Sequence, residues 1–237
     1  MSSSNAPFRP LCRATIADDF QQLVRMDPLF AILDPPAGAI PLWKRAQGFE
    51  TLIRIVLEQQ VSLAAGGTMH RRLKQACGGR INAASITAMQ FQGLRANGIT
   101  TQKAKTMLGL ADASKSRKLR LASLTKMNAT AIRTHLTQFH GIGPWTAEVY
   151  LMMALLHPDA FPPGDMALVL QWKRLLHMHE HGGTHQRAIR AYQTAASLRR
   201  GDFDEMMTHA GSWQPFRGTA ARYLWHVYLH AGKESAG

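Results

Sequence analysis

A glycine-rich turn and an aspartate downstream of it are the two features of this chain that can do chemistry. The turn lies in Leu136-Thr-Gln-Phe-His-Gly-Ile-Gly-Pro-Trp-Thr-Ala147, and the acid ends Phe161-Pro-Pro-Gly-Asp165. Gly141 and Gly143 remove the Cβ penalty of a tight turn, and a helix beginning at Pro144 offers its first N–H groups to an anion. The pattern predicts a phosphate-binding turn paired with one carboxylate, a combination suited to chemistry on DNA.

Asp165 has two compatible roles. It precedes a helical run from Met166 to His177, so it occupies an N-cap position, where aspartate is common. The same carboxylate can stabilise a positive charge that develops during a reaction, or orient a water molecule for attack. Local sequence alone favours the capping role.

Helical periodicity runs through almost the whole chain, and no stretch alternates convincingly as a strand. One predicted helix face carries Phe49, Leu52, Ile53, Val56, Leu57 and Gln60. Capping residues, prolines and glycines then predict helices from Ser62 to Gly78-Gly79, from Thr100 or Thr101 through Ala113, from Asn128 to Phe139, from Pro144, from Asp165, and from about Pro215 to His230. The sequence predicts an all-α protein of about ten helices.

Length and composition set the domain organisation. With 237 residues and 46% hydrophobic content, the chain fits one large domain or two lobes that share a cleft. We expect a short N-terminal extension over residues 1–42 that packs on the core, with a helix or two around Ile16 to Leu33. The helical core then covers residues 43–231. Residues 232–237 and Met1 to Pro10 look loose.

The charge balance favours a polyanion as partner. The chain has 28 Lys and Arg against 15 Asp and Glu, a formal net charge of +13, and a sequence pI near 10.4. Between Gly66 and Ala147, 13 basic residues face one acid, Asp112. A solvated surface is the ordinary interpretation of a basic run, but this run leads directly into the phosphate-binding turn. We therefore expect salt-dependent binding to a nucleic acid backbone.

Several classes of protein are disfavoured. No apolar run reaches the roughly 20 residues of a membrane span, and Met1 to Pro10 lacks the pattern of a secretory signal. Cys12 and Cys77 are too few for a disulfide framework or an iron-sulfur cluster. Four histidines could suggest a metal, but a solvated or DNA-facing helix end is favoured because no ligand set of defined spacing accompanies His177, His179, His181 and His185. We expect a monomeric cytoplasmic protein, nucleoid-associated if bacterial, without membrane contact.

The chain resembles the helix-hairpin-helix (HhH-GPD) DNA glycosylases, most closely the 3-methyladenine DNA glycosylase II branch, over roughly residues 49–228. The resemblance implies a two-lobed all-α fold with the active-site cleft between the lobes, the hairpin at residues 136–147, and Asp165 as the essential catalytic residue. Besides the hairpin and the Gly164-Asp165 pair, the motifs that carry it are Leu57-Glu-Gln-Gln-Val-Ser62, Gly98-Ile-Thr-Thr-Gln-Lys-Ala104, and Trp213-Gln-Pro-Phe-Arg217 leading to Trp225.

Trp145 predicts the type of reaction within that resemblance. Bifunctional relatives hold a lysine just before the Thr-Ala pair, and its amine forms a Schiff base with the sugar. Tryptophan stands there in this chain. The resemblance therefore implies a monofunctional N-glycosylase without AP lyase activity, without an iron-sulfur cluster, and with alkylated purines as substrate, 3-methyladenine first and 7-methylguanine also.

The resemblance also implies the residues that receive the flipped base. Trp145 and Trp225 match two tryptophans of the base pocket, where an indole face attracts a positively charged purine. Val149 and Met166 stand where the branch can offer tyrosines, so the pocket is expected to be wider or less aromatic. Taken alone, each tryptophan is more often a core residue.

The expected DNA contacts come from three segments. The hairpin contributes main-chain groups, the loop from Gly98 to Lys103 contributes a wedge at Thr101, with Ile99 or Gln102 as alternatives, and the first motif contributes Gln59 and Gln60. The wedge loop can equally be an inert capped turn, and glutamine on a helix is usually solvated. The hairpin residues expected at the backbone of double-stranded DNA with alkylated bases are Gly141, Ile142, Gly143, Pro144 and Thr146.

No cofactor is required by this interpretation. In the resembling family the hairpin commonly holds a monovalent cation, Na+ or K+, through main-chain carbonyls. By position these are the carbonyls of Thr137, Phe139 and Ile142.

Three other functions remain open on the sequence. The chain can be a glycosylase for a different damaged base, a non-catalytic DNA-damage-binding protein, or an RNA-binding structural protein. Asp165 argues against the second, and the combination of Trp145, Asp165 and Trp225 argues against the third.

Overall fold

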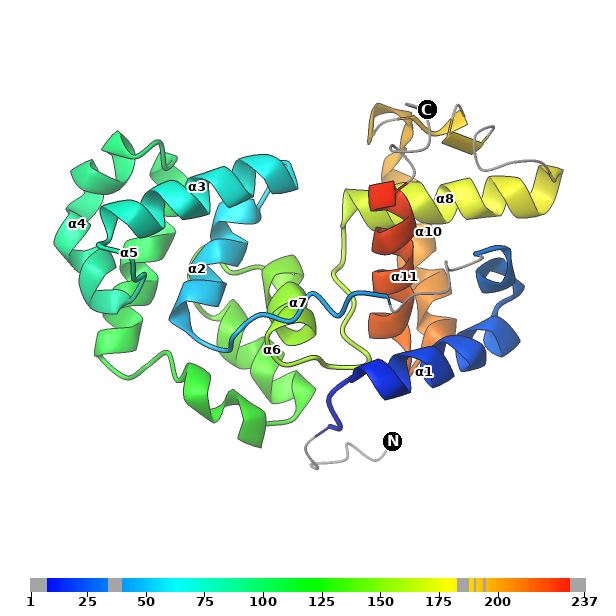
Figure 1. Cartoon of the computed structure of the whole chain (residues 1–237), viewed down its shortest axis with the longest axis horizontal. Helices are drawn as coiled ribbons and strands as arrows, with labels where there is room; N and C mark the ends of the chain where they lie inside the picture. The colour runs from blue at the N-terminus through cyan, green and yellow to red at the C-terminus, as the bar shows by residue number, and fades with distance from the viewer. Residues whose placement is uncertain (1–7, 34–39, 183–187, 190, 194, 231–237) are drawn as a thin grey trace. The chain divides into compact units, whose positions relative to one another are not determined.

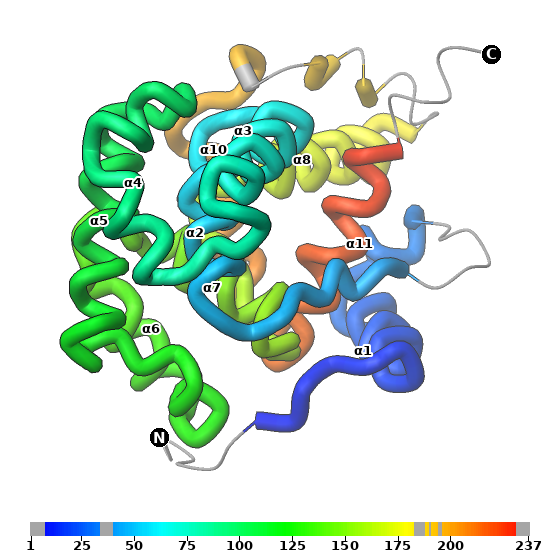
Figure 2. Tube along the Cα trace, turned by 60° about the vertical axis from the view of Figure 1, so that its left-hand side comes forward, coloured from blue at the N-terminus to red at the C-terminus, as the bar shows by residue number. Residues whose placement is uncertain are grey.

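The structure, a computed structural model, describes residues 8–33, 40–182, 188–189, 191–193 and 195–230 (Figures 1 and 2). In these residues all regular structure is α-helix or 3₁₀ helix, which confirms the predicted all-α fold. Of the segments predicted to be loose, residues 232–237 and the first seven residues of Met1 to Pro10 lie outside the described residues.

The chain divides into two compact units. We call Met1–Phe8 with Arg45–Leu155 the hairpin unit, and Arg9–Lys44 with Leu156–Gly237 the aspartate unit. Residues 9–44 thus group with the C-terminal helices. The domain boundary at residue 42 and the cleft between lobes stay predictions.

The hairpin unit is built from six α-helices and one 3₁₀ helix in its described residues. Side chains of Ser62, Asn82, Thr100 and Asn128 each accept an N–H of the first helical turn that follows. The predicted starts at Ser62, Thr100, Asn128 and Pro144 are confirmed. The elements are α2 (Phe49–Glu58), α3 (Leu63–Ala76), α4 (Ala83–Ala96), α5 (Thr101–Lys115), η2 (Leu121–Lys126), α6 (Ala129–Thr137) and α7 (Pro144–Met153).

Helix α2 is the centre of the hairpin unit, where it contacts α3, α5 and α7. Four residues of its predicted apolar face, Leu52, Ile53, Val56 and Leu57, are each 0% exposed, whereas Phe49 at the start of the helix is half-buried. Gln60 was placed on this face wrongly, because α2 ends at Glu58 and Gln60 is exposed with a φ of +55°. Helices α4 and α5 lie side by side on the flank of the unit (Figures 1 and 2).

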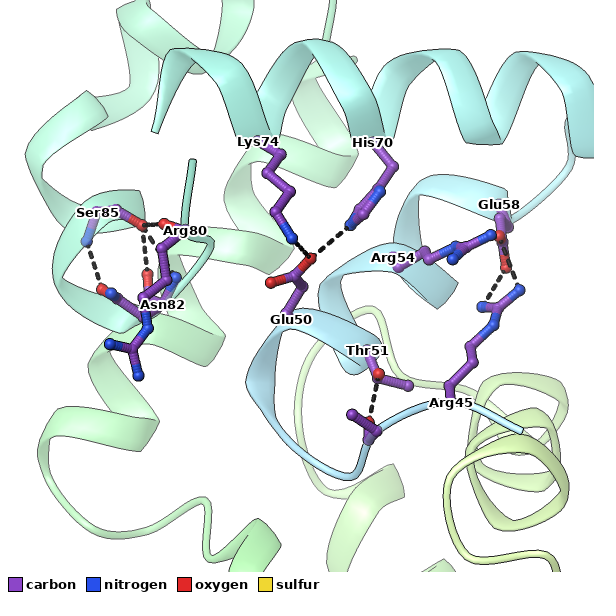
Figure 3. A network of polar contacts seen from close by, with 11 residues as sticks. Arg45, Glu50, Thr51, Arg54, Glu58, His70, Lys74, Arg80, Asn82 and Ser85 are labelled. Carbon is purple, nitrogen blue, oxygen red and sulfur yellow. Dashed lines mark hydrogen bonds and ion pairs between the residues drawn. The ribbon is translucent and has the colours of Figure 1, made fainter. Parts of the chain in front are cut away.

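Ion pairs fasten α2 to its surroundings (Figure 3). The buried carboxylate of Glu58 accepts two hydrogen bonds from Arg45, of 2.7 and 3.0 Å, and one from Arg54 of 3.1 Å. Glu50, at the other end of α2, pairs with Lys74 at 2.8 Å and with His70 at 3.2 Å, both on α3. Each acid is therefore matched by partners, and the C-terminal end of α2 is held in place.

The aspartate unit is also helical in its described residues. Helix α8 packs against α11, α10 and η1, and α1 packs against α11 (Figure 1). The helices predicted around Ile16 to Leu33 are confirmed, and α8 continues four residues beyond the predicted His177. The elements are α1 (Arg13–Met26), η1 (Pro28–Ile32), α8 (Met166–His181), η3 (Ala195–Ser197), α10 (Arg200–Ala210), η4 (Gly211–Trp213) and α11 (Arg217–His230).

Asp27 joins the N-terminal segment to the C-terminal helices. Its buried Oδ2 accepts hydrogen bonds of 2.7 Å from His209 Nε2 and from Trp213 Nε1, and its Oδ1 accepts one of 3.0 Å from Leu29 N–H. Burial by itself raises the pKa of Asp27, but the hydrogen bonds from His209 and Trp213 hold that pKa below its ordinary value. This polar centre explains why residues 9–44 belong to the aspartate unit.

Candidate functional site

The hairpin between α6 and α7 requires glycine at its first glycine position. Gly141 has a φ of +81°, and a Cβ there would lie 2.0 Å from the hydroxyl oxygen of Thr106 on α5. Ile142 is buried at 3% exposure, and its N–H donates to the carbonyl of Phe139 at 3.0 Å. Gly141 is therefore fixed by its own backbone and by Thr106, a partner that the sequence did not reveal.

Gly143 has a different reason for being glycine. Its φ of −87° suits any residue, and a Cβ there would meet nothing within 4 Å. The predicted Cβ penalty is therefore wrong at this position. What glycine leaves at Gly143 is open space at the N-terminus of α7, where Pro144 occupies the first helical position. An oxyanion can approach the main chain there, because helix N-termini favour negative charge.

Gln59 braces the hairpin from the end of α2. Its amide nitrogen donates to the carbonyl of Gly141 at 3.0 Å and to the hydroxyl of Thr146 at 2.9 Å, and Thr146 is only 2% exposed. These groups are used inside the protein. DNA contacts by Gln59 and Thr146 stay predictions, and the groups left for such contacts are the Gln59 side-chain oxygen and the Thr146 main chain.

Lys103 connects the wedge loop, Gly98 to Lys103, to the C-terminal end of α2. Its ammonium group donates to the carbonyls of Leu57 and Gln59, at 2.7 and 2.9 Å, and its burial lowers the pKa of Lys103. A cation at the last carbonyls of α2 also interacts favourably with the helix dipole. The start of α5, the end of α2 and the hairpin are thus joined through Lys103 and Gln59.

The residues proposed to insert into the DNA duplex differ in exposure. Thr101 and Gln102 are exposed at the start of α5, whereas Ile99 is 0% exposed and cannot enter a DNA duplex. Gln60 is also exposed and holds a positive φ, as residues at functional sites often do. The predicted contacts by Thr101 and Gln60 remain available in this structure.

The basic run is largely free for a ligand. Lys74 pairs with Glu50, Lys103 binds carbonyls, and Arg133 of α6 binds Glu148 of α7 with two of its nitrogens. Lys118 and Arg120 line a surface hollow of about 740 Å³ together with the hairpin residues Gln138 and Phe139. The remaining ten basic residues of the run have exposed side chains: Arg71, Arg72, Arg80, Arg95, Lys105, Lys115, Arg117, Lys118, Arg120 and Lys126.

The α7 residues predicted for the base pocket differ in exposure. Trp145 is half-buried in the first turn of α7, and Val149 follows one helical turn later. Val149 is only 2% exposed, so little of its side chain is accessible, and its place in the base pocket stays a prediction. Met166, at the start of α8 in the aspartate unit, is 54% exposed and available to a ligand.

Asp165 is the N-cap of α8, as predicted. Its Oδ1 accepts hydrogen bonds from the N–H groups of Ala167 and Leu168, both at 3.1 Å, and from the indole N–H of Trp225 at 3.2 Å. Three donors on one oxygen fix the carboxylate, and the helix N-terminus stabilises its negative charge. The side chain is half-buried, so the group keeps access to a ligand.

Trp225 brings a second predicted residue to this carboxylate. It lies on α11, which reaches the N-terminus of α8 because the two helices pack together. The hydrogen bond from its indole to Asp165 had no signal in the sequence, since the residues are sixty positions apart. The aspartate unit thus presents an anchored carboxylate directly beside a half-buried indole.

The residues proposed for a monovalent cation lie in the hairpin turn. The Phe139 carbonyl already accepts the Ile142 N–H at 3.0 Å, and a carbonyl has a second lone pair for a cation. This turn is compatible with cation binding by the carbonyls of Thr137, Phe139 and Ile142, which stays a prediction.

The described residues include no group of three or more His, Cys, Asp and Glu that could hold a metal ion. His177 and His181 stack at the end of α8 with ring centroids 4.6 Å apart. His185 lies outside the described residues. Nor does the described part of the chain contain a helix with the length and apolarity of a membrane span.

A glycine hairpin between two helices and a carboxylate at a later helix N-terminus are the features of this helical fold to compare with known proteins. No family model matches the chain. A DNA-3-methyladenine glycosylase of Bacillus subtilis is 26% identical over 222 residues, which cover 88% of this chain and 66% of that protein. The chain therefore spans slightly less than two thirds of this relative.

Solved structures share the fold. The 3-methyladenine DNA glycosylase Mag1 of Schizosaccharomyces pombe, in complex with abasic DNA, is 23% identical with a TM-score of 0.69, over 90% of this chain and 97% of that one. An 8-oxoguanine glycosylase/lyase of Clostridium acetobutylicum is 17% identical with a TM-score of 0.60, over 92% of this chain and 70% of that one. The chain is thus similar in sequence to 3-methyladenine DNA glycosylases and has the helical fold of the helix-hairpin-helix (HhH-GPD) DNA glycosylases.

Proposed function

We propose that this chain is a monofunctional DNA N-glycosylase that hydrolyses the glycosidic bond of alkylated purines, 3-methyladenine first and 7-methylguanine also. It leaves an abasic site for base excision repair. The observation that carries the proposal is Asp165, whose Oδ1 is held by two main-chain N–H groups and by the indole of Trp225.

The carboxylate suits the charge that this reaction develops. As the bond from C1′ to the base breaks, deoxyribose becomes cationic, and an oriented anion stabilises it or aligns a water molecule that attacks C1′. While it is attached to deoxyribose, a purine alkylated at a ring nitrogen, as in 3-methyladenine, carries a positive charge. It therefore leaves as a neutral base without a proton from a general acid. Asp165 needs to be oriented and reachable, and its hydrogen bonds and partial exposure support both.

The hairpin unit supplies the grip on DNA. Open space at Gly143 and the N-terminus of α7 suit a backbone phosphate, and the exposed basic run adds charge that does not depend on sequence. The relatives named as 3-methyladenine glycosylases support this substrate. We propose that the protein acts as a monomer on double-stranded DNA.

Trp145 supports hydrolysis without strand cleavage. Its side chain has no amine, so it cannot form the Schiff base that precedes the lyase reaction. Glycosylase/lyases share this fold, so the fold alone does not distinguish the two reactions. A trapping experiment does so directly.

The experiment incubates the protein with duplex DNA that has been methylated on its purines and identifies released bases by chromatography. Free 3-methyladenine with an intact strand supports the proposal, and borohydride trapping should give no covalent complex. A different released base points to another lesion, and binding without any release points to a non-catalytic damage-binding protein. Strand cleavage or a trapped complex contradicts the monofunctional assignment.

A further inference from the structure

Trp43 is an aromatic residue of the aspartate unit. It lies outside any helix, is half-buried, and has a φ of +45°. A bulky side chain at positive φ is a genuine outlier, because its Cβ is crowded by the backbone, and such strain persists only where the surroundings impose it. The contacts that hold Trp43 in this conformation come from α11.

Helix α11 holds Trp43 from two sides. Arg222, a buried residue of α11, donates from Nε to the carbonyl of Leu42 at 3.4 Å and from a terminal nitrogen to Gly218 at 2.9 Å. Trp225 follows Arg222 by three positions, so the two side chains leave the same face of the helix. One residue of α11 therefore fixes the peptide before Trp43, and another contacts its ring.

The indoles of Trp43 and Trp225 stand nearly perpendicular, and the indole of Trp225 contacts the carboxylate of Asp165. The ring centroids of Trp43 and Trp225 are 6.2 Å apart with an interplanar angle of 76°, and Trp225 donates to Asp165 at 3.2 Å. All three residues belong to the aspartate unit. The arrangement forms a corner with two aromatic walls and a fixed anion.

The other tryptophans of this unit show what a core residue looks like. Trp172 and Trp213 are 1% and 0% exposed, and each sits within a helical element. Trp43 and Trp225 are both half-buried, which leaves part of each indole accessible. A side chain that served only to fill the core would need neither the strained backbone nor the remaining exposure.

We propose that Trp43 contacts the damaged base: its indole and that of Trp225 form the two walls of the corner that receives a flipped, positively charged purine next to Asp165. This assignment rests on the proposed function and deepens it. A flat base that stacks on one indole presents its edge to the other, and electron-rich ring faces attract a cationic base more than a neutral one. Trp43 is then a residue that selects for charged lesions.

The test compares Trp43→Phe, Trp43→Leu and Trp43→Gly with the wild type in single-turnover release of 3-methyladenine. Trp43→Leu should slow release about 10- to 100-fold, since one aromatic contact to a base is lost, and Trp43→Phe should stay within about threefold. Inhibition by free 3-methyladenine should weaken in parallel with the rate. Affinity for an undamaged duplex should not change in any variant.

The variant Trp43→Gly tests whether a loss of base release comes from the lost contact with the base or from impaired folding. Glycine accepts a φ of +45° without strain, so this variant should unfold at a temperature no lower than Trp43→Leu, yet lose base release to the same extent. The matched control is Gln90→Gly, which relieves a φ of +55° at an exposed position of the hairpin unit and should leave release unchanged.

The outcomes distinguish the two proposals. Absence of base release from the wild type contradicts the proposed function and this assignment together. Normal release by Trp43→Leu beside an active wild type contradicts only the assignment. A slower Trp43→Leu whose inhibition by free 3-methyladenine is unchanged also contradicts it, because Trp43 would then act through Trp225 rather than touch the base.

Discussion

The hairpin unit and the aspartate unit differ more in charge than in architecture. Both are helical, but residues 1–8 and 45–155 carry 15 basic and four acidic residues, a net charge of +11, whereas the rest of the chain carries 13 and 11, a net charge of +2. Three of the four acids of the hairpin unit, Glu50, Glu58 and Glu148, are in ion pairs. Attraction for phosphate is therefore concentrated in one unit.

The aspartate unit instead depends on a few side chains, each of which has its own specific contacts. Asp27 anchors the N-terminal segment, Asp165 caps α8, and the indole of Trp225 contacts Asp165. Binding to the DNA backbone is expected to depend on many exposed charges and one turn of the hairpin unit. Base release is expected to depend on the orientation of one carboxylate in the aspartate unit. If this division is correct, each property can be removed without the other.

The largest effect is expected from Asp165→Asn. The amide is nearly the same size but has no negative charge to stabilise a deoxyribose cation, so base release should fall about 1,000-fold. Single-turnover chromatography measures the rate, and a duplex-binding assay should give unchanged affinity. Near-normal release would remove Asp165 from the mechanism and the chemistry from this unit.

The second prediction concerns the two glycines of the hairpin, Gly141 and Gly143. Gly141→Ala forces a methyl group onto Thr106 at positive φ and should destabilise the protein by about 2 kcal/mol or more. Gly143→Ala meets open space and should leave the free energy of unfolding unchanged, while it weakens duplex binding about tenfold by crowding a phosphate. Denaturant unfolding and binding assays on both variants provide the measurement. Equal binding by Gly143→Ala and wild type would argue against a phosphate at this position.

The third prediction concerns the polar centre of the aspartate unit. The pKa of Asp27 is depressed, so its stabilisation is fully present above about pH 4 and is lost as the pH falls through its lower pKa in the folded state. Asp27→Asn should cost about 2 kcal/mol at pH 7, because buried donors lose an anionic acceptor. Unfolding by denaturant at pH 7 and pH 3 checks this. The gap between variant and wild type should narrow at pH 3, and a gap independent of pH would contradict the role of the charge.

The smallest effect is expected from single surface charges. Lys118→Gln and Arg120→Gln each remove one exposed cation beside the hairpin and should lower the slope of log affinity against log salt by about 1 if that side chain meets a phosphate. Arg25→Gln, an exposed change in the aspartate unit, is the matched control and should leave the slope unchanged. Equal slopes for all three would break the proposed division of charge.

Much of the fold was predictable because its signals are local. Ser62, Thr100, Asn128 and Asp165 each begin a helix at the expected place, since an N-cap bonds an N–H only two or three residues away. The end of α2 was missed at Gln60, because periodicity alone does not mark where a helix stops. Ion pairs such as Arg45 with Glu58 join positions thirteen apart and had no local signal.

The candidate site was predictable by residue type but not by contact. Asp165, Trp225 and the hairpin were all identified from the sequence, whereas the bond that joins Asp165 to Trp225 was not. Gln59 and Thr146 look like surface polar residues in the sequence, yet they bond each other behind the hairpin. Trp43 lies in no motif, so only its ring geometry and its positive φ draw attention to it.

The sequence by itself determined the helical fold, the basic character, the glycine turn and the aspartate at a helix start, because periodicity, charge and capping act over a few residues. Only the tertiary structure decided which glycine is indispensable, which glutamine is a brace and which tryptophans remain exposed. Those properties depend on atoms from distant segments: Thr106 against Gly141, Gln59 against Thr146, and α11 against both Trp43 and Asp165.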